Sequence, residues 1–377
     1  MPSPSTAASK PRTRDPWFDN AKMALVTLVV VGHTIPLLPS TGLNDHLYDF
    51  LYAWHVPAFV LVTGYLSRSF EWERRRMWQL VRTVVVPYVI FECALALFRI
   101  HVGGEQLEDL FSDPHWPMWY LSALFFWRLL TPVFKRLPAA LPVALLISLA
   151  AGLYAGDTLD LARVLGLLPF FVMGLLATPE RFERLRTAKV QVAAVLVFAG
   201  IWVLTTWTDR WAATEWLYYR SRYADLDVSD SEAFVIRAVV LMVGTLGAWA
   251  FLALVPRVGG WFTRMGAWTL VVYLFHGFAV KGADYAGYPD WAADHGTFAL
   301  LVTVVAAVAL SFLLAWEPVA RRLNHLVDPV GYAERHLHQA HATANAKAEA
   351  DVISEAVEDA ATMRAMPVDA SSTRASR

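Results

Sequence analysis

Long apolar runs constrain this 377-residue chain more than any other feature. A run of about 20 apolar residues is long enough to cross a bilayer as an α-helix. Counting such runs predicts an all-α, polytopic membrane fold with about ten transmembrane helices. The predicted spans cover residues 21–38, 48–67, 78–99, 117–134, 139–155, 161–177, 189–206, 234–255, 266–280 and 297–316.

The composition agrees with a membrane protein. Charged residues make up 17% of the chain and hydrophobic residues 56%, whereas soluble domains carry about 25% charged residues. The single cysteine, Cys93, excludes an intramolecular disulfide and a cysteine-based metal cluster. Since no cofactor, metal or nucleic-acid motif is present, we expect neither a cofactor, nor a metal, nor a nucleic-acid partner.

The distribution of lysine and arginine predicts the orientation in the membrane. If the N-terminus is cytoplasmic, the loops on that side carry seventeen of these residues and the opposite loops carry four. Because positive charge accumulates on the cytoplasmic side, we predict a multi-pass protein of the plasma membrane with both termini in the cytoplasm. Residues 1–18 then form a disordered cytoplasmic arm, and 19–325 form the membrane domain. Residues 326–377 form a polar cytoplasmic tail, helical at first and then disordered.

Three histidines, His33, His55 and His276, interrupt the apolar segments. Measured from the nearest cytoplasmic cation at about 1.5 Å per residue, they lie roughly 16, 20 and 18 Å into the membrane. Ionisable groups at this depth are costly and often mark a working site, although a single one is more often a hydrogen-bonded packing residue. The common depth predicts a shared polar site, where a neutral imidazole serves either as a general base or as a proton relay.

A group of cations marks the predicted cytoplasmic face. We name it the cationic collar, and its members are Arg14, Lys22, Arg68, Arg74, Arg75 and Arg76. One interpretation is that these charges only determine topology. The other is that they bind a phosphorylated ligand, because arginine pairs bidentately with phosphate. Lys22 is the strongest candidate, since it is a lone cation just inside the first span.

Two segments in the first half of the chain resemble a known family. Lys22-x(10)-His33 resembles the Arg/Lys-x(10)-His signature of acyltransferase family 3, integral membrane O-acyltransferases that modify glycans and related acceptors. The stretch Trp54-His-Val-Pro-Ala-Phe-Val-Leu-Val-Thr-Gly-Tyr-Leu66 resembles the second span of the fucose-4-O-acetylase-like branch. It departs from that pattern at Trp54, Val56 and Thr63.

Two further segments, Trp119-Tyr-Leu-Ser-Ala-Leu124 and Tyr273-Leu-Phe-His276, are similar to family segments and follow in the expected order. The resemblance implies that residues 19–325 are an acyltransferase domain. It would move an acyl group, expected to be acetyl from acetyl-CoA, from cytoplasmic acyl-CoA to a hydroxyl of a sugar, glycan or glycolipid of the cell envelope.

The resemblance also implies roles for individual residues. The collar would bind the phosphates of the donor, and the pantetheine arm would carry the thioester to His33. There His33 would deprotonate the acceptor or carry the acyl group transiently, with His55 and His276 completing the catalytic set. Asp19, Trp119 and Tyr273 would position the substrates. The acceptor would enter past the aromatic loop 207–232, which is interpreted either as an interfacial belt or as a sugar platform.

The alternative function is a proton-coupled transporter or flippase that uses the histidines as a relay. Transporters of this kind commonly contain internal repeats. The Lys-x(10)-His pattern has no counterpart in the second half of the chain. This favours the enzyme over the transporter.

The predicted orientation is testable by labelling. Replacing Cys93 by Ser gives a cysteine-free background. In it, an impermeant maleimide applied to intact cells should label Ser221→Cys and spare Ser372→Cys, because the first is expected outside and the second inside. The reverse pattern would reject the orientation and the depth argument together.

Overall fold

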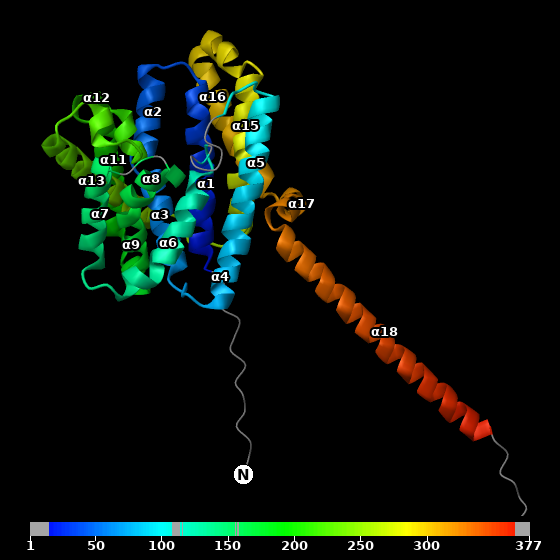
Figure 1. The fold of residues 1–377 in the computed structure, drawn as a ribbon. Helices are drawn as coiled ribbons and strands as arrows, with labels where there is room; N and C mark the ends of the chain where they lie inside the picture. The colour runs from blue at the N-terminus through cyan, green and yellow to red at the C-terminus, as the bar shows by residue number, and fades with distance from the viewer. Residues whose placement is uncertain (1–14, 108–113, 115, 155, 157, 366–377) are drawn as a thin grey trace, which may run out of the picture. The chain divides into compact units, whose positions relative to one another are not determined.

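A computed structural model of the chain describes residues 15–107, 114, 116–154, 156 and 158–365, and within them it contains helices and turns but no strand (Figure 1). Residues 1–14, which include Arg14 of the collar, lie outside the described residues, and so do residues 366–377 of the tail. The chain divides into two compact units at Val327 and Asp328. The helices are α1 (Pro16–Thr34), α2 (Gly42–Tyr52), α3 (His55–Ser67), α4 (Arg74–Leu80), α5 (Val86–His101), α6 (Trp119–Arg136), α7 (Ala140–Tyr154), α8 (Leu161–Gly166), α9 (Leu168–Leu175), α10 (Pro179–Arg184), α11 (Ala188–Thr205), α12 (Thr208–Trp211), α13 (Asp230–Leu254), α14 (Trp261–Met265), α15 (Thr269–Tyr285), α16 (Tyr288–Ala315), α17 (Glu317–Val327) and, in the second unit, α18 (Pro329–Ala365).

The all-helical fold class is confirmed, and each predicted apolar run falls largely on a helix. Among the described residues, six helical stretches are long and apolar enough to cross a membrane, or seven if the bent pair α8–α9 is one span. The predicted number of about ten is therefore not confirmed. The difference comes from short or charged helices. Helix α7 has 15 residues, α15 has 17, and α6 carries Arg128 and two terminal cations.

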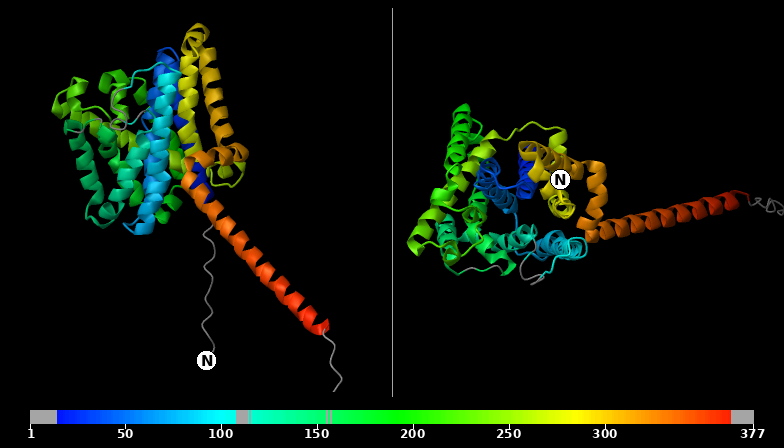
Figure 2. Two further views of the ribbon diagram at one scale, coloured as in Figure 1. Left: turned by 45° about the vertical axis from the view of Figure 1, so that its right-hand side comes forward. Right: turned by 90° about the horizontal axis from the view of Figure 1, so that it is seen from above.

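Helix α1 lies inside the bundle, between the helices drawn in green and those drawn in yellow and orange (Figure 2). Its start is fixed by the Asp15 carboxylate, which accepts a hydrogen bond from the backbone N–H of Trp17 at 3.0 Å, and by Pro16 in the first turn. The Asn20 amide donates to the carbonyls of Pro256 (2.8 Å) and Val258 (3.1 Å). These bonds hold α1 against the connection between α13 and α14.

Helices α3 and α9 cross at two glycines. A Cβ added to Gly64 would collide with the carbonyl of Phe171, and one added to Gly174 would collide with the carbonyl of Leu61. Small residues let two backbones approach this closely, as is common between membrane helices. The crossing fixes α3, and with it the position of His55 at its first residue.

Two interruptions shape the walls around α1. Residues Val81–Val85 (η2) form a π-helical stretch that ends two residues before Pro87, which lacks the N–H that would continue regular α-helical bonding. The axes of α8 and α9 are bent by 57° at Leu167, and Pro169 lies in the first turn of α9. The π-helical stretch carries Thr83 and Val84, which line the pocket described below.

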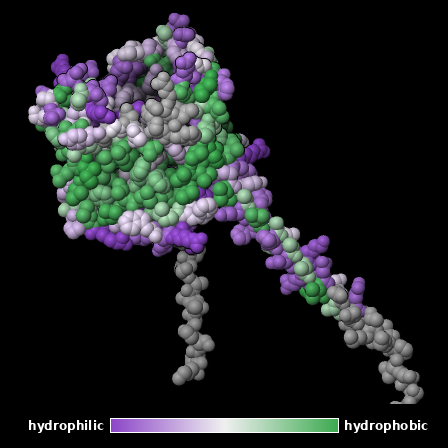
Figure 3. Space-filling view, viewed as in Figure 1, coloured by the Kyte–Doolittle hydropathy of each residue, from purple (hydrophilic) through white to green (hydrophobic). Residues whose placement is uncertain are grey.

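An apolar band covers the middle of the first unit on the face drawn in Figure 3, with hydrophilic residues beyond it. The connection from α3 to α4 and the connection from α6 to α7 lie at the same end of the first unit (Figure 1), so their lysines and arginines, among them Arg74 and Lys135, lie there too. Ion pairs join the segments there. Lys135 and Arg136 bind Glu71, and Arg257 binds Glu183 at 3.0 Å. We call this the basic end.

The glycine crossing generates a stability prediction. Gly64→Ala should destabilise the protein by about 1–3 kcal/mol, because the added methyl meets backbone that cannot move without shifting a helix. Gly200→Ala is the matched control, since a Cβ there has no atom within 4 Å. Thermal unfolding in detergent should show a lower midpoint for Gly64→Ala and an equal or higher one for Gly200→Ala. Equal midpoints for Gly64→Ala and the parent would show that the crossing of α3 and α9 is loosely packed.

Candidate active site

Helices α1 and α15 bring two of the three predicted histidines together. The Nδ1 atom of His33 lies 2.8 Å from Nε2 of His276, and the two rings are stacked with centroids 5.1 Å apart. Eleven residues earlier on α1, the Lys22 ammonium donates to the carbonyl of Gly266 at 3.0 Å. The two helices therefore run parallel in register, and the level of Lys22 and the level of the histidine pair are about 16 Å apart.

The backbone determines which nitrogen of each ring carries the proton. Nδ1 of His276 lies 2.6 Å from the carbonyl of Tyr273, and a carbonyl can only accept, so this nitrogen is protonated. In a neutral His276, Nε2 is then the acceptor, and Nδ1 of His33 donates to it. A neutral His33 thereby keeps its lone pair on Nε2. This is the arrangement of an oriented base, with His276 holding the ring and stabilising the imidazolium.

His55 lies near the pair without a direct bond to it. It is buried, and its Nδ1 is 2.7 Å from the carbonyl of Leu51, so its second nitrogen is also the unprotonated one when the ring is neutral. Gly32 explains why Tyr52 and His55 can approach α1 closely. A Cβ there would lie 3.1 Å from the Tyr52 ring and 3.8 Å from Nε2 of His55. The absent side chain lets the junction of α2 and α3 pack beside His33.

Aromatic and charged side chains surround the half-buried His33. The Trp116 ring is 4.4 Å from the His33 ring, measured between centroids. On α8, Arg163 donates to the carbonyl of Tyr218 at 3.3 Å, pairs with Asp160 at 3.4 Å, and places its guanidinium carbon 4.9 Å from the centre of the Trp119 ring. Trp119 is thus an arginine-stacking residue in this structure.

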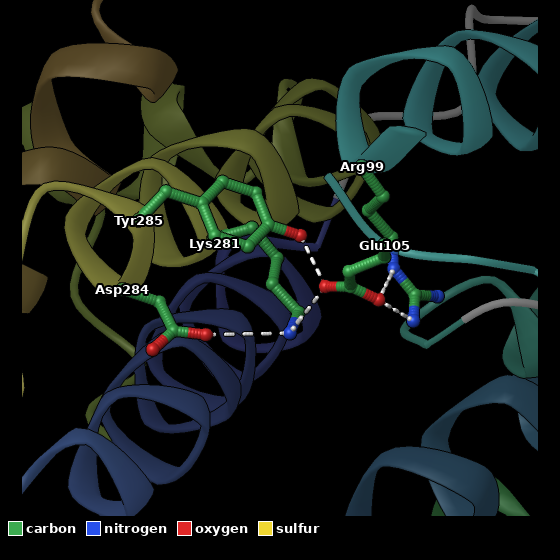
Figure 4. Close-up of polar contacts among 5 residues, drawn as sticks. All are labelled: Arg99, Glu105, Lys281, Asp284 and Tyr285. Atoms are coloured by element: carbon green, nitrogen blue, oxygen red, sulfur yellow. Dashed lines mark hydrogen bonds and ion pairs between the residues drawn. The ribbon is translucent and has the colours of Figure 1, made fainter. Parts of the chain in front are cut away.

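The connection between α5 and α6 is tied to α15 on both sides of its undescribed residues. At one side, the Glu105 carboxylate binds Arg99, Lys281 and Tyr285, with Lys281 at 3.2 Å and also paired with Asp284 (Figure 4). At the other side, the buried Tyr273 hydroxyl donates to the carbonyl of Pro117. These contacts hold the residue that covers His33, Trp116, to the helix that carries His276.

A pocket of about 240 Å³ lies between α1, α3, η2, α6 and α15. Its wall includes Lys22 and Arg128, the hydroxyls of Ser67 and Thr83, and Tyr273. The Tyr273 ring is 5.9 Å from the His276 ring, so this pocket extends from the level of Lys22 towards the histidine pair. Its polar groups are suited to a thin ligand with an anionic end.

The collar residues are not equivalent in the structure. Lys22 is not a lone cation, because Asp19 pairs with it at 2.8 Å. Asp19 accordingly neutralises Lys22. Arg68 stacks on the Tyr65 ring and donates to the carbonyl of Ala177 at 3.2 Å. The remaining members described by the structure lie in the first turn of α4, with Arg74 and Arg75 exposed and Arg76 half-buried, and none of the three lines the pocket.

Several residues near the site were missed by sequence reasoning. Arg128 and Arg163 fell inside predicted spans and were left out of the loop charges, although a charge inside a span is itself the signal for a site. Trp116 and Ser67 carry no such signal. Their place depends on contacts between helices distant in sequence.

Three rings of the aromatic loop lie inside the protein. Trp216, Tyr219 and Tyr223 are buried and surround the Arg237 guanidinium, whose carbon is 5.0 Å from the centre of the Tyr219 ring. At these three positions the rings form a cation–π cluster inside the protein instead of an interfacial belt or an open sugar platform.

An apolar helical bundle with an oriented imidazole pair at its interior defines a membrane-embedded site suited to proton transfer at a hydroxyl. Residues 15–316 match acyltransferase family 3, described as an acyltransferase domain. The chain therefore belongs to this family and is a membrane acyltransferase. It is 24% identical over 351 residues to "Nodulation protein NolL" of Mesorhizobium japonicum, covering 83% of this chain and 89% of the relative. No solved structure matches the chain.

The Glu105 cluster predicts a pH-dependent stability. Burial alone raises the pKa of the Glu105 carboxyl, but hydrogen bonds from its three partners outweigh this and lower the pKa from the ordinary 4.5 to about 2. Because the folded-state pKa is the lower one, the carboxylate stabilises the fold above about pH 4.5, and this contribution is lost as the pH falls towards 2. The thermal midpoint of the parent should lie above that of Glu105→Gln at pH 6, and the two midpoints should converge as the pH falls from about 4.5 towards 2. A difference that stays constant down to pH 2 would contradict the assignment.

Proposed function

We propose that the protein transfers an acyl group, expected to be acetyl, from acyl-CoA at the basic end to a hydroxyl of a sugar, glycan or glycolipid. The observation that carries this proposal is the oriented histidine pair beyond a narrow pocket whose wall includes Lys22 and Arg128. The family membership supports the reaction type, and the geometry supports the route. The basic end faces the cytoplasm of a cell whose plasma membrane holds the protein, in keeping with the positive charge gathered there.

The transfer requires one proton movement in each direction. The lone pair on Nε2 of His33 takes the proton of the acceptor hydroxyl as its oxygen attacks the thioester carbonyl carbon. The tetrahedral intermediate collapses with cleavage of the carbon–sulfur bond. The imidazolium then returns the proton to the departing thiolate, giving free CoA and the O-acylated acceptor. His276 holds the ring through the Nδ1–Nε2 hydrogen bond during both steps.

The side chains around His33 position the substrates. Trp116 offers an aromatic face on the side away from the basic end, where a sugar ring can stack, and Trp119 holds the Arg163 guanidinium near it. Arg163 is within electrostatic reach of His33 and is fixed by Asp160 and the carbonyl of Tyr218. A thioester is already activated, so orientation and one base are sufficient for substantial rate acceleration.

The proposal is tested by following release of CoA thiol from acetyl-CoA by purified Cys93→Ser protein, which has no thiol of its own. Turnover should depend on an added acceptor. His33→Ala should lower it by about 10²–10⁴-fold, the usual cost of removing a general base. His276→Ala should cost less, about 10²-fold, through misorientation of His33. His55→Ala should be the mildest of the three.

Protein amount and acetyl-CoA binding, measured separately, serve as controls for the three variants. A loss far above 10⁴-fold in His33→Ala would favour a covalent acyl-histidine over a base. If His55→Ala is more damaging than His33→Ala, the base lies on α3. Near-native turnover in all three variants, or a parent protein that moves protons without cleaving acetyl-CoA, would reject the proposed function.

A further inference from the structure

Two polar groups in the wall of the 240 Å³ pocket lack partners within the described chain. The Ser67 hydroxyl is buried, with the residue 4% exposed, and no hydrogen-bond partner lies in reach of its oxygen. The Arg128 guanidinium lines the same pocket and makes no hydrogen bond or ion pair with any described residue. The other cation of the pocket differs, because Lys22 is bound by Asp19 and by the carbonyl of Gly266.

An unneutralised guanidinium among apolar helices is costly, and buried polar groups in native proteins normally have partners. Both residues line one pocket, and one of them carries a permanent cation while the other carries a small hydroxyl. Their common complement is an anion with several acceptor oxygens. Phosphate has this chemistry, since arginine binds it through two parallel N–H donors.

Size and depth restrict which phosphate fits. A pocket of about 240 Å³ is below the roughly 300–1,000 Å³ that holds a drug-sized molecule, so a whole nucleotide is too large for it. Arg128 lies on the face of α6 that also carries Tyr120 and Leu124, about 12 Å further along the helix than Tyr120. The ligand therefore has a phosphate near the basic end and a thin chain leading towards the histidines.

We propose that Arg128 and Ser67 bind the phosphate at the end of the donor's pantetheine arm, an inference that rests on acyl-CoA being the donor. The arm from this phosphate oxygen to sulfur has thirteen atoms in line, comparable to about four extended residues or roughly 15 Å. This is close to the roughly 16 Å between the levels of Lys22, which lines the same pocket as Arg128, and His33. A phosphate held at Arg128 puts the thioester at the imidazole pair and leaves the nucleotide outside the pocket, beside the exposed arginines of α4.

The test compares two donors that differ only in this phosphate, S-acetyl-4′-phosphopantetheine and S-acetylpantetheine. In the parent protein the phosphorylated donor should have a kcat/KM about ten- to a hundredfold higher, the worth of a charge-assisted contact. Arg128→Gln should bring the ratio close to one, Arg128→Lys should retain part of it, and Ser67→Ala should lower it severalfold. Arg136→Gln is the matched control, because Arg136 lies on the same helix but binds Glu71 at the surface, and its ratio should equal that of the parent.

A second measurement does not depend on Arg128 variants folding. In the Cys93→Ser background, S-acetyl-4′-phosphopantetheine should protect Ser67→Cys from a maleimide at concentrations where S-acetylpantetheine does not. Three results would each overturn the phosphate site. The two donors protect Ser67→Cys equally, or the kcat/KM ratio of the two donors is the same in Arg128→Gln as in the parent, or this ratio is near one in the parent. A lipid phosphate as the true ligand would give those same results, together with a change of copurified phospholipid in Arg128→Gln. Failure of the parent to use any thioester would instead contradict the proposed function.

Discussion

Within an apolar bundle, the pairing of polar side chains decides how the helices are arranged. Water is absent from the bilayer core, so a charge or imidazole there must find its partner in the protein or in a ligand. Lys22 finds Asp19 and Gly266, His33 finds His276, and Arg163 finds Asp160. The Lys22 bond holds α1 to Gly266, three residues before α15 begins, and the histidine pair joins α1 to α15 itself, so together they set the register of the two helices. The site is a consequence of this register, because the same contacts that align the helices also orient the base.

The helices could be predicted from sequence because hydrophobic length is a local property of the chain. Each apolar run became a helix, yet the number of spans did not follow, because α7 and α15 are short and α8 bends into α9 by 57°. The spacing of Lys22 and His33 separates two levels of the bundle, since rise per residue is fixed in a helix, and Lys22 contacts Gly266 at one level while His33 contacts His276 at the other. Even the pairing of Asp19 with Lys22 was within reach, as the two lie three residues apart on one face.

Other parts of the site depend on contacts that no local pattern contains. His33 and His276 are 243 residues apart, and only the packing of α1 against α15 brings them within 2.8 Å. Trp116 belongs to the connection between α5 and α6, which is placed over His33 by bonds to α15. Part of the aromatic loop depends on such a contact as well. Its rings suggested a surface, but the buried Arg237 gathers three of them into the interior.

The glycine crossing of α3 and α9 bears on how substrates reach the histidines. Alternating access depends on one group of helices rocking against another around a central site. At Gly64 and Gly174 the two backbones already touch, and sliding by one turn would bring larger side chains against the same carbonyls. This seam resists shear, and α3 contributes to the wall of the pocket as well as carrying His55. We therefore expect donor and acceptor to approach a stationary centre from opposite ends, so that an acyl group crosses the membrane while the helices keep their places.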